Sequence, residues 1–99
     1  MEIFWRAEAL EHLEHIREYI ARDNPRKALD VWERIYEYAE EQLLVTETVK
    51  RLSKSGKVEG TRELVVQDYP NYIIVYRMHE TEIEILAVRH GKRKWPTSF

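Results

Sequence analysis

The sequence predicts an α+β fold, a small antiparallel sheet packed against an N-terminal helix hairpin in the order β-α-α-β-β-β. Two amphipathic helical patterns follow one another in the first half of the chain, and three short strand patterns separated by turn residues fill the second half. With 99 residues, 43% of them apolar, the chain can bury one hydrophobic core. We therefore expect residues 1–99 to form a single domain.

The N-terminal part predicts a short strand followed by a helix. Residues 3–5 are Ile-Phe-Trp, a run of strand-forming side chains that precedes the first charged helical pattern. Between about residues 6 and 23, apolar side chains recur at spacings of three and four, at Leu10, Leu13, Ile16 and Ile20. This spacing indicates an amphipathic helix with one apolar stripe.

A second helix is expected over residues 25–43. Asn24-Pro25 separates it from the first, because proline disfavours a helical residue before it but suits the first helical position. Its apolar stripe contains Ala28, Val31, Trp32, Ile35, Ala39 and Leu43. The aromatic residues near these stripes occur at helical spacing, so we interpret them as core or groove residues: Trp5, Trp32, Tyr36 and Tyr38.

The second half begins with a segment that lacks a sustained period. Residues 46–60 are polar and basic and include two glycines, which favours a mobile loop. Strand patterns then cover residues 62–66, 72–78 and 82–89, and turn residues separate them. In the last strand Ile83, Ile85 and Ala87 alternate with glutamates, while Leu86 and Val88 predict partial burial of the sheet's second face.

Composition excludes several classes of function. The chain has no cysteine, which excludes disulfides, thiolate metal sites and cysteine nucleophiles, and suits a cytoplasmic location. No apolar run approaches the roughly 20 residues of a membrane span. The three glycines are too dispersed for a phosphate-binding loop, and we expect no cofactor. His12 and His15 share a helix face but lack a convincing third metal ligand, so we expect both at the surface and no metal.

The net charge of −2 hides an uneven distribution. Residues 1–49 hold 6 Lys and Arg against 12 Asp and Glu, whereas residues 50–99 hold 10 against 6. An acidic half is thus joined to a basic half. This pattern favours a basic face for an anionic partner, and two solvated faces of opposite sign are the alternative.

Three segments in the second half resemble the core of the RelE/ParE toxins of type II toxin-antitoxin systems. They are Lys-Val-Glu-Gly-Thr-Arg-Glu-Leu-Val-Val at 57–66, Tyr-Ile-Ile-Val-Tyr-Arg at 72–77, and Val-Arg-His-Gly-Lys-Arg-Lys-Trp-Pro at 88–96. With the N-terminal strand and the helix hairpin, they occur in the order typical of the family. The ending, with His90, Arg93 and Pro96, is more similar to the ParE branch.

The resemblance implies a growth-inhibiting toxin that is neutralised by a small cognate antitoxin. ParE-type members poison DNA gyrase without a catalytic group, whereas RelE-type members cut messenger RNA on the ribosome. We expect a ParE-type gyrase inhibitor, because a ribosome-directed nuclease would profit from positive charge and this chain has a net charge of −2. The alternatives are a ribosome-dependent endoribonuclease and an inactive interaction module.

The candidate site residues come from the basic half. The residues expected to bind the target are Lys57, Arg62, Arg89, His90, Lys92, Arg93, Lys94 and Trp95. A nuclease would instead need cations beside the phosphate and a group that exchanges a proton near neutral pH. Those roles fall to Arg62, Arg77 and His90.

Overall fold

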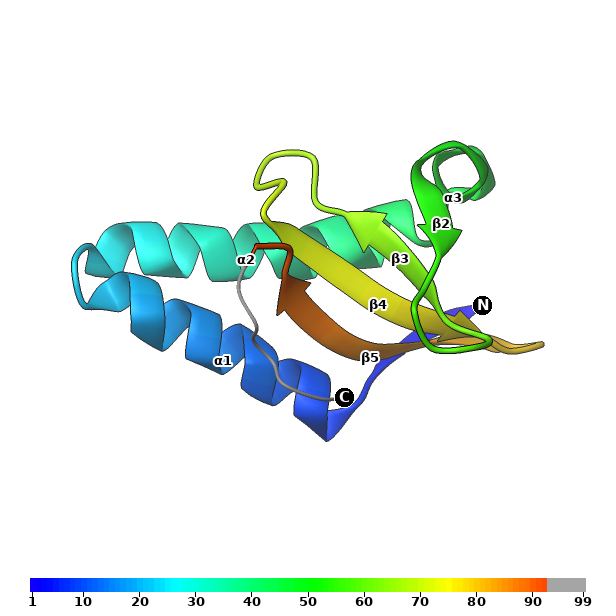
Figure 1. Cartoon of the computed structure of the whole chain (residues 1–99), viewed down its shortest axis with the longest axis horizontal. Coiled ribbons are helices and arrows are strands. Elements are labelled where there is room, and N and C mark those ends of the chain that lie inside the picture. Colours follow the sequence, from blue (N-terminus) through cyan, green and yellow to red (C-terminus); the bar gives the residue numbers. More distant parts are fainter. Residues whose placement is uncertain (93–99) are drawn as a thin grey trace.

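The computed structural model, which describes residues 1–92, is a layer of helices against one sheet (Figure 1). The helices are α1 (Ala7–Ala21), α2 (Pro25–Gln42) and α3 (Thr46–Leu52). The strands are β1 (Glu2–Trp5), β2 (Ser53–Ser55), β3 (Arg62–Val65), β4 (Tyr72–Met78) and β5 (Glu82–His90). They form a five-stranded sheet in the order β1-β5-β4-β3-β2. The predicted α+β class is confirmed.

The helix hairpin breaks where the sequence predicts. Asn24 has an extended backbone, and its side-chain oxygen accepts a hydrogen bond from the Lys27 amide at 3.1 Å, which caps α2. Pro25 occupies the start of that helix, where no amide hydrogen is required. Within residues 1–92, no helix combines the length and the apolar character that crossing a bilayer requires.

The sheet is mostly antiparallel, as expected, and differs from the expectation in one parallel pairing. β1 pairs in parallel with β5, with Ile3 opposite Ile83 and Trp5 opposite Ile85. The remaining neighbours, β5 with β4, β4 with β3 and β3 with β2, pair antiparallel. The chain reaches the parallel position because α1 and α2 separate β1 from the later strands, and parallel pairing needs such a long connection.

The expectation of a mobile loop over residues 46–60 is wrong for its first ten residues, which form α3 and β2. Glu47 lies in the first turn of α3 and Lys50 and Arg51 in its last, charges that suit the helix dipole. Val49 and Leu52 pack against the core. β2 is held by antiparallel pairing with β3, a tertiary interaction that local periodicity does not reveal.

β5 contains a bulge that divides it into two parts. Odd-numbered side chains face the helices before the bulge, and even-numbered side chains face them after it. Tyr76 lies opposite Ile85 and Val75 opposite Ala87, so Leu86 is the extra residue. Ile83, Ile85 and Val88 therefore belong to the core beside the helices. Ala87 does not face with Ile83 and Ile85 as the alternation predicted; it pairs with Val75 on the second face of the sheet, where both are fully buried.

The core lies between the helix hairpin and the sheet. Of the residues on the two predicted stripes, Leu13, Ile16, Val31 and Ile35 are at most 3% exposed, whereas Leu10 is 43% exposed. The aromatic residues pack as expected: Tyr38 is buried, and Trp5, Tyr36 and Trp32 form a stack with ring centroids 4.9 and 5.6 Å apart. The apolar stripes therefore pack the two helices against the sheet.

We predict that Ile35→Ala lowers the free energy of unfolding by about 2–5 kcal/mol, because Ile35 is fully buried and its truncation leaves a cavity. Urea denaturation measures this change. Leu29→Ala is the matched control, since Leu29 lies on the same helix and is 51% exposed. Equal effects of the two substitutions would contradict the core assignment.

Candidate functional site

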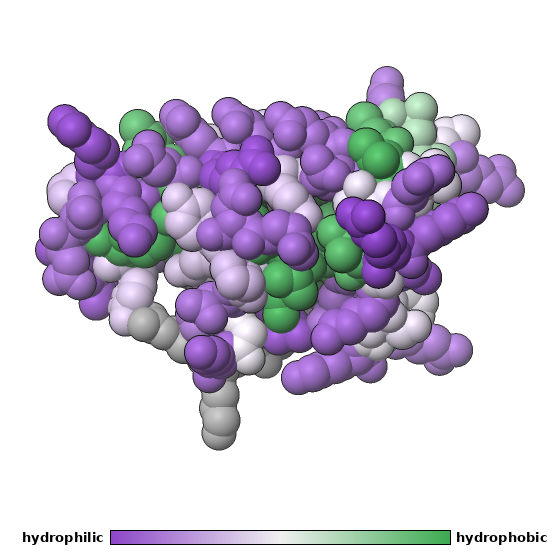
Figure 2. Space-filling model, turned by 90° about the horizontal axis from the view of Figure 1, so that it is seen from above, coloured by the Kyte–Doolittle hydropathy of each residue, from purple (hydrophilic) through white to green (hydrophobic). Residues whose placement is uncertain are grey.

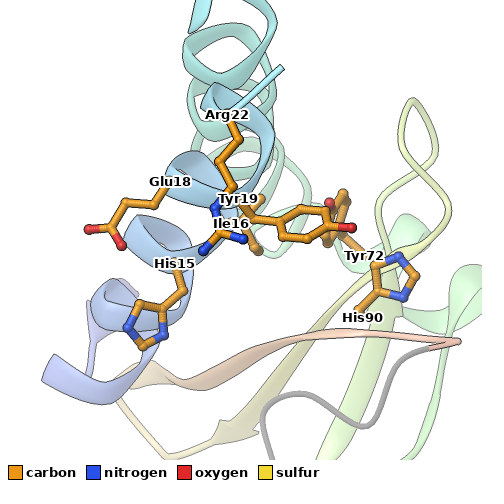
Figure 3. Close-up of a pocket in the computed structure, with 7 residues that line it drawn as sticks. All are labelled: His15, Ile16, Glu18, Tyr19, Arg22, Tyr72 and His90. Carbon is orange, nitrogen blue, oxygen red and sulfur yellow. The ribbon is translucent and has the colours of Figure 1, made fainter. Parts of the chain in front are cut away.

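His90 lies at the end of β5, on the face of the sheet that carries the helices. It is opposite Tyr72 of β4, and the two rings meet edge to face with centroids 5.3 Å apart. Figure 3 shows Tyr19 of α1 reaching toward Tyr72 and His90, and these residues border a pocket of about 290 Å³. The α1 residues that line this pocket are His15, Ile16, Glu18, Tyr19 and Arg22.

The His90 ring is oriented by the chain that follows it. Its Nδ1 accepts a hydrogen bond from the Lys92 amide at 3.1 Å, which places the proton of the neutral ring on Nε2. Lys92 itself is exposed. The other three residues predicted for this end, Arg93, Lys94 and Trp95, lie outside the described residues.

Arg62 lies on the same face of the sheet as His90 but at its other end. It is opposite Tyr76, which places it four residues along β4 from the Tyr72–His90 pair, about 13 Å at the rise of a strand. Its Nε donates to Ser53 Oγ at 3.3 Å, and Ser53 also hydrogen-bonds the buried Tyr76 hydroxyl. Arg62 is thus held against β2.

Arg89 lies on the face of the sheet away from the helices and forms an ion pair within the protein. Its Nη2 donates to Glu63 Oε1 at 2.8 Å, with the arginine and glutamate side chains 17% and 3% exposed. Within residues 1–92, Glu63 Oε2 and Arg89 Nε are buried without a hydrogen-bond partner. This ion pair neutralises the charge of Arg89 inside the fold, so the residue contributes to the sheet and offers little charge to a target.

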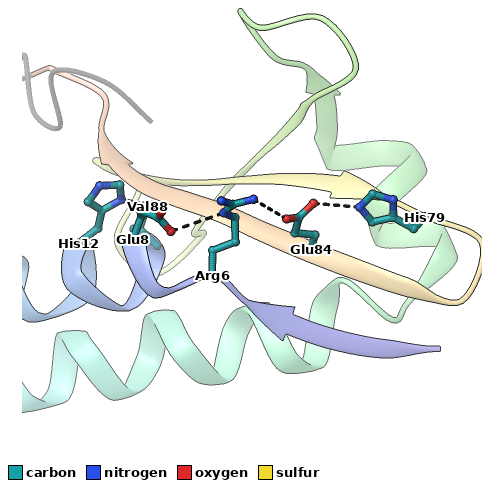
Figure 4. A network of polar contacts seen from close by, with 6 residues as sticks. All are labelled: Arg6, Glu8, His12, His79, Glu84 and Val88. Carbon is teal, nitrogen blue, oxygen red and sulfur yellow. Dashed lines mark hydrogen bonds and ion pairs between the residues drawn. The ribbon is translucent and has the colours of Figure 1, made fainter.

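Arg77 also faces the second side, near the turn between β4 and β5. Glu84 lies directly opposite it, but Figure 4 shows the Glu84 carboxylate bonded instead to Arg6 at 2.9 Å and to His79 at 2.9 Å. Those hydrogen bonds lower the pKa of Glu84, chiefly the one from His79, against the effect of burial. Among the described residues Arg77 has no hydrogen bond or ion pair, and it borders a small pocket with Val58 and Thr61.

The structure therefore does not bring the three candidate nuclease residues together. His90 and Arg62 share a face but occupy opposite ends of the sheet, and Arg77 lies on the other face. The wider set of predicted target-binding residues is divided in the same way. Lys57 is exposed in the loop between β2 and β3, whereas Lys92 is exposed beyond β5.

Three cations that were not among the candidate site residues lie on α3 and β2, next to the predicted Lys57. Lys50, Arg51 and Lys54 are exposed, and Lys57 follows in the adjoining loop. Within residues 1–92, none of the four forms an ion pair. The signal that could have found them was the acidic first turn and basic last turn of residues 46–52, which are typical of a short helix.

His12 is buried, which corrects its predicted surface position. It is 8% exposed, and its Nδ1 accepts a hydrogen bond from the Val88 amide at 3.2 Å. The Val88 amide lies in the part of β5 that extends beyond its pairing with β1. The His12 imidazole therefore accepts the hydrogen bond that a neighbouring strand would otherwise accept. Burial, and secondarily the nearby His15, lowers the pKa of His12, while Glu11 and Glu8 act in the opposite direction. The neutral form is the one that can accept the bond.

Comparisons with known proteins agree with one another. A family model described as the ParE toxin of the type II toxin-antitoxin system parDE matches residues 3–95. A protein of Sinorhizobium fredii named "Putative toxin Y4kP" is 36% identical over 94 residues, which are 95% of this chain and 92% of that protein. A solved chain of the chromosomal ParDE TA system from P. aeruginosa has the same fold, with a TM-score of 0.77, 24% identity, and coverage of 91% of this chain and 95% of that one.

We predict that Glu63→Leu lowers the free energy of unfolding by about 3 kcal/mol, because it leaves the Arg89 guanidinium largely buried without its carboxylate. The double variant Glu63→Leu/Arg89→Leu should recover most of this loss, since neither charge then remains inside. Chemical denaturation of both variants measures the difference. A double variant as unstable as the single variant would show that the unpaired Arg89 charge is not the cause of the lost stability.

The buried His12 predicts a pH dependence of stability. Its pKa in the folded protein is lower than the unfolded value of about 6.5, so the unfolded chain binds the proton more readily. Stability from this group is present above pH 6.5 or so and is lost as the pH falls through the folded pKa. Denaturant titrations between neutral and acidic pH should show this decline, and His12→Asn, which keeps an acceptor without titrating, should flatten it. An identical decline in the variant would exclude His12 as its source.

Proposed function

Because the chain belongs to the ParE toxin family of type II toxin-antitoxin systems, we propose that it arrests growth by binding DNA gyrase and that a small cognate antitoxin neutralises it. The family match extends over residues 3–95 and so includes every candidate site residue. The choice of target within this proposal depends on whether the chain carries an assembled catalytic site.

The separation of the candidate nuclease residues is the observation that carries the proposal. Cleavage of RNA needs a proton-exchanging group and a cation within hydrogen-bond reach of the same phosphate. His90 and Arg62 are separated by about 13 Å along β4, and Arg77 projects from the opposite face. Arg89, the nearest arginine in sequence to His90, is neutralised by Glu63. A toxin that acts by binding needs no such convergence.

In this proposal the target surface is the end of the sheet where β5 finishes. His90 and the exposed Lys92 lie there, and the following residues Arg93, Lys94 and Trp95 continue the chain from this end. Cations near the surface steer an anionic partner, and a tryptophan supplies a large contact area at low entropic cost. Lys57 and Arg62, at the other end of the sheet, are not part of this surface.

A cognate antitoxin is proposed from the family and from the charge distribution. The solved chain with the same fold is described as part of a ParDE TA system, in which toxin and antitoxin form a pair. In this protein the Lys and Arg residues outnumber Asp and Glu only in the second half, so an antitoxin segment rich in carboxylates would be attracted to it.

We predict that the purified protein inhibits gyrase supercoiling and that His90→Gln weakens this inhibition only modestly, by the equivalent of one lost contact. Glutamine retains hydrogen-bonding capacity but cannot titrate. The same two proteins should leave ribosome-bound messenger RNA intact. His79→Gln is the matched control, because His79 lies at the opposite end of β5 in the Glu84 network.

Messenger RNA cleavage by the natural protein, reduced about 10²- to 10⁴-fold in His90→Gln, would replace the proposal with an endoribonuclease. Absence of growth arrest as well as of both activities would instead identify the chain as an inactive interaction module.

A further inference from the structure

The sheet ends in two edge strands, and only one of them is protected against pairing with another chain. β1 and β2 stand at the ends of the strand order, so one side of each has no strand neighbour among residues 1–92. β2 consists of Ser53, Lys54 and Ser55, and an exposed lysine on a polar strand is a common protection of an edge. Figure 2, seen from the side on which Figure 1 places β2 and α3, shows mostly hydrophilic residues. The β2 edge is therefore unsuited to a further strand.

The centre of β1 has no such protection. Ile3, Phe4 and Trp5 are apolar, and Phe4 is 53% exposed on the face of the sheet away from the helices. Exposed apolar edge strands are templates for pairing, because their unpaired backbone groups and apolar side chains both gain from a neighbouring strand. The free edge of β1 is therefore the side of this sheet best suited to a partner strand.

The hydrogen bonds to β5 determine which backbone groups of β1 point outward. The amides of Glu2 and Arg6 donate to backbone oxygens on the β5 side, at 3.3 and 3.0 Å. Backbone direction alternates along a strand, so Phe4 also directs its N–H and C=O groups toward β5. The corresponding groups of Ile3 and Trp5 point to the free edge, where a partner strand would bond to them.

The sequence of β1 is complementary to itself when two copies pair antiparallel about Phe4. In this register Ile3 of one copy lies opposite Trp5 of the other, and each such pair exchanges both of its N–H···O bonds. The two Phe4 residues meet on the twofold axis as a pair without backbone hydrogen bonds, the arrangement in which side chains come closest. Glu2 of each copy lies opposite Arg6 of the other.

The charges at the ends of β1 favour this register. Glu2 lies opposite Glu82 in the parallel ladder, and within residues 1–92 neither carboxylate forms an ion pair. Arg6 donates through Nε to Glu8 and through Nη1 to Glu84, bonds that use only part of its guanidinium donors. Arg6 of a second copy can therefore supply a cation to Glu2 and Glu82.

We propose that two copies of this protein associate through the free edges of their β1 strands, which pair antiparallel about Phe4 and join the two sheets into one. A second copy is the partner that this edge fits, because the apolar centre, the outward backbone groups and the flanking charges are each matched by the same segment reversed. Such a contact closes on itself and leaves no β1 edge for a third copy. His90 and Lys92 lie beyond the part of β5 that pairs with β1, so the proposed target surface stays outside the contact.

Analytical ultracentrifugation of the purified protein over a range of concentrations tests the pairing. Because strands of four residues make a small contact, we expect a reversible equilibrium between monomer and dimer. Phe4→Lys should raise the dissociation constant at least about tenfold, since it removes the central aromatic pair and places two like charges opposite each other. Leu29→Lys is the matched control, because Leu29 is 51% exposed on α2, and it should leave the equilibrium unchanged.

A pair of opposite charges tests the register itself. Phe4→Glu should also remain monomeric alone, whereas an equimolar mixture of Phe4→Lys and Phe4→Glu should form a mixed dimer, because position 4 of one copy faces position 4 of the other. Circular dichroism and the urea midpoint first establish that both variants fold, as expected at an exposed position. A mixture that associates no better than either variant alone would contradict the register.

Amide hydrogen exchange of the natural protein identifies the strand edge without any substitution. The amides of Ile3 and Trp5 should become protected as the concentration rises, whereas β5 already protects the amide of Phe4 in the monomer. A protein that stays monomeric at every concentration would overturn the inference. So would a dimer that leaves the Ile3 and Trp5 amides unprotected, or one that Phe4→Lys and Leu29→Lys weaken equally.

Discussion

The single extra residue in β5 is the constraint on which the arrangement of this protein depends. Side chains alternate between the faces of a strand, so the bulge at Leu86 reverses the facing of every residue beyond it. Before the bulge, Ile83 and Ile85 face the helices; after it, Val88 and His90 do. Without it, Arg89 would project into the helix layer and His90 onto the second face. The facing of Arg89 and His90 follows from this register.

The consequence is a molecule with two distinct ends. One end carries His90, the Lys92 amide that orients it, and the start of the C-terminal segment. The other carries α3 and β2 with their exposed cations Lys50, Arg51 and Lys54. Between them, Arg89 is neutralised by Glu63, and Glu84 is held by Arg6 and His79. The positive charge of the second half is therefore available mainly at the two ends, away from the paired groups between them.

The parts of the fold predicted from the sequence are those in which local pattern and tertiary structure agree. The helical stripes identified Leu13 and Ile35 as core, and Asn24-Pro25 identified the break between helices. α3 and β2 were not predicted, because elements of seven and three residues are too short to show a clear periodicity. They also depend on contact with the core and with β3, which the local sequence does not reveal. The facing of Arg89 and His90 was not predictable from the sequence, since a bulge results from pairing with another strand.

The central proposal is that this toxin acts by binding and not by turnover, because the candidate nuclease residues His90, Arg62 and Arg77 do not converge. The most direct measurement is stoichiometric: the purified protein is titrated against gyrase, and the number of messenger RNA cleavages per toxin molecule is counted on translating ribosomes in parallel. The account predicts inhibition of gyrase that saturates at a defined molar ratio, with no multiple turnover of RNA. Repeated cleavage of messenger RNA by each toxin molecule, with gyrase unaffected, would contradict it.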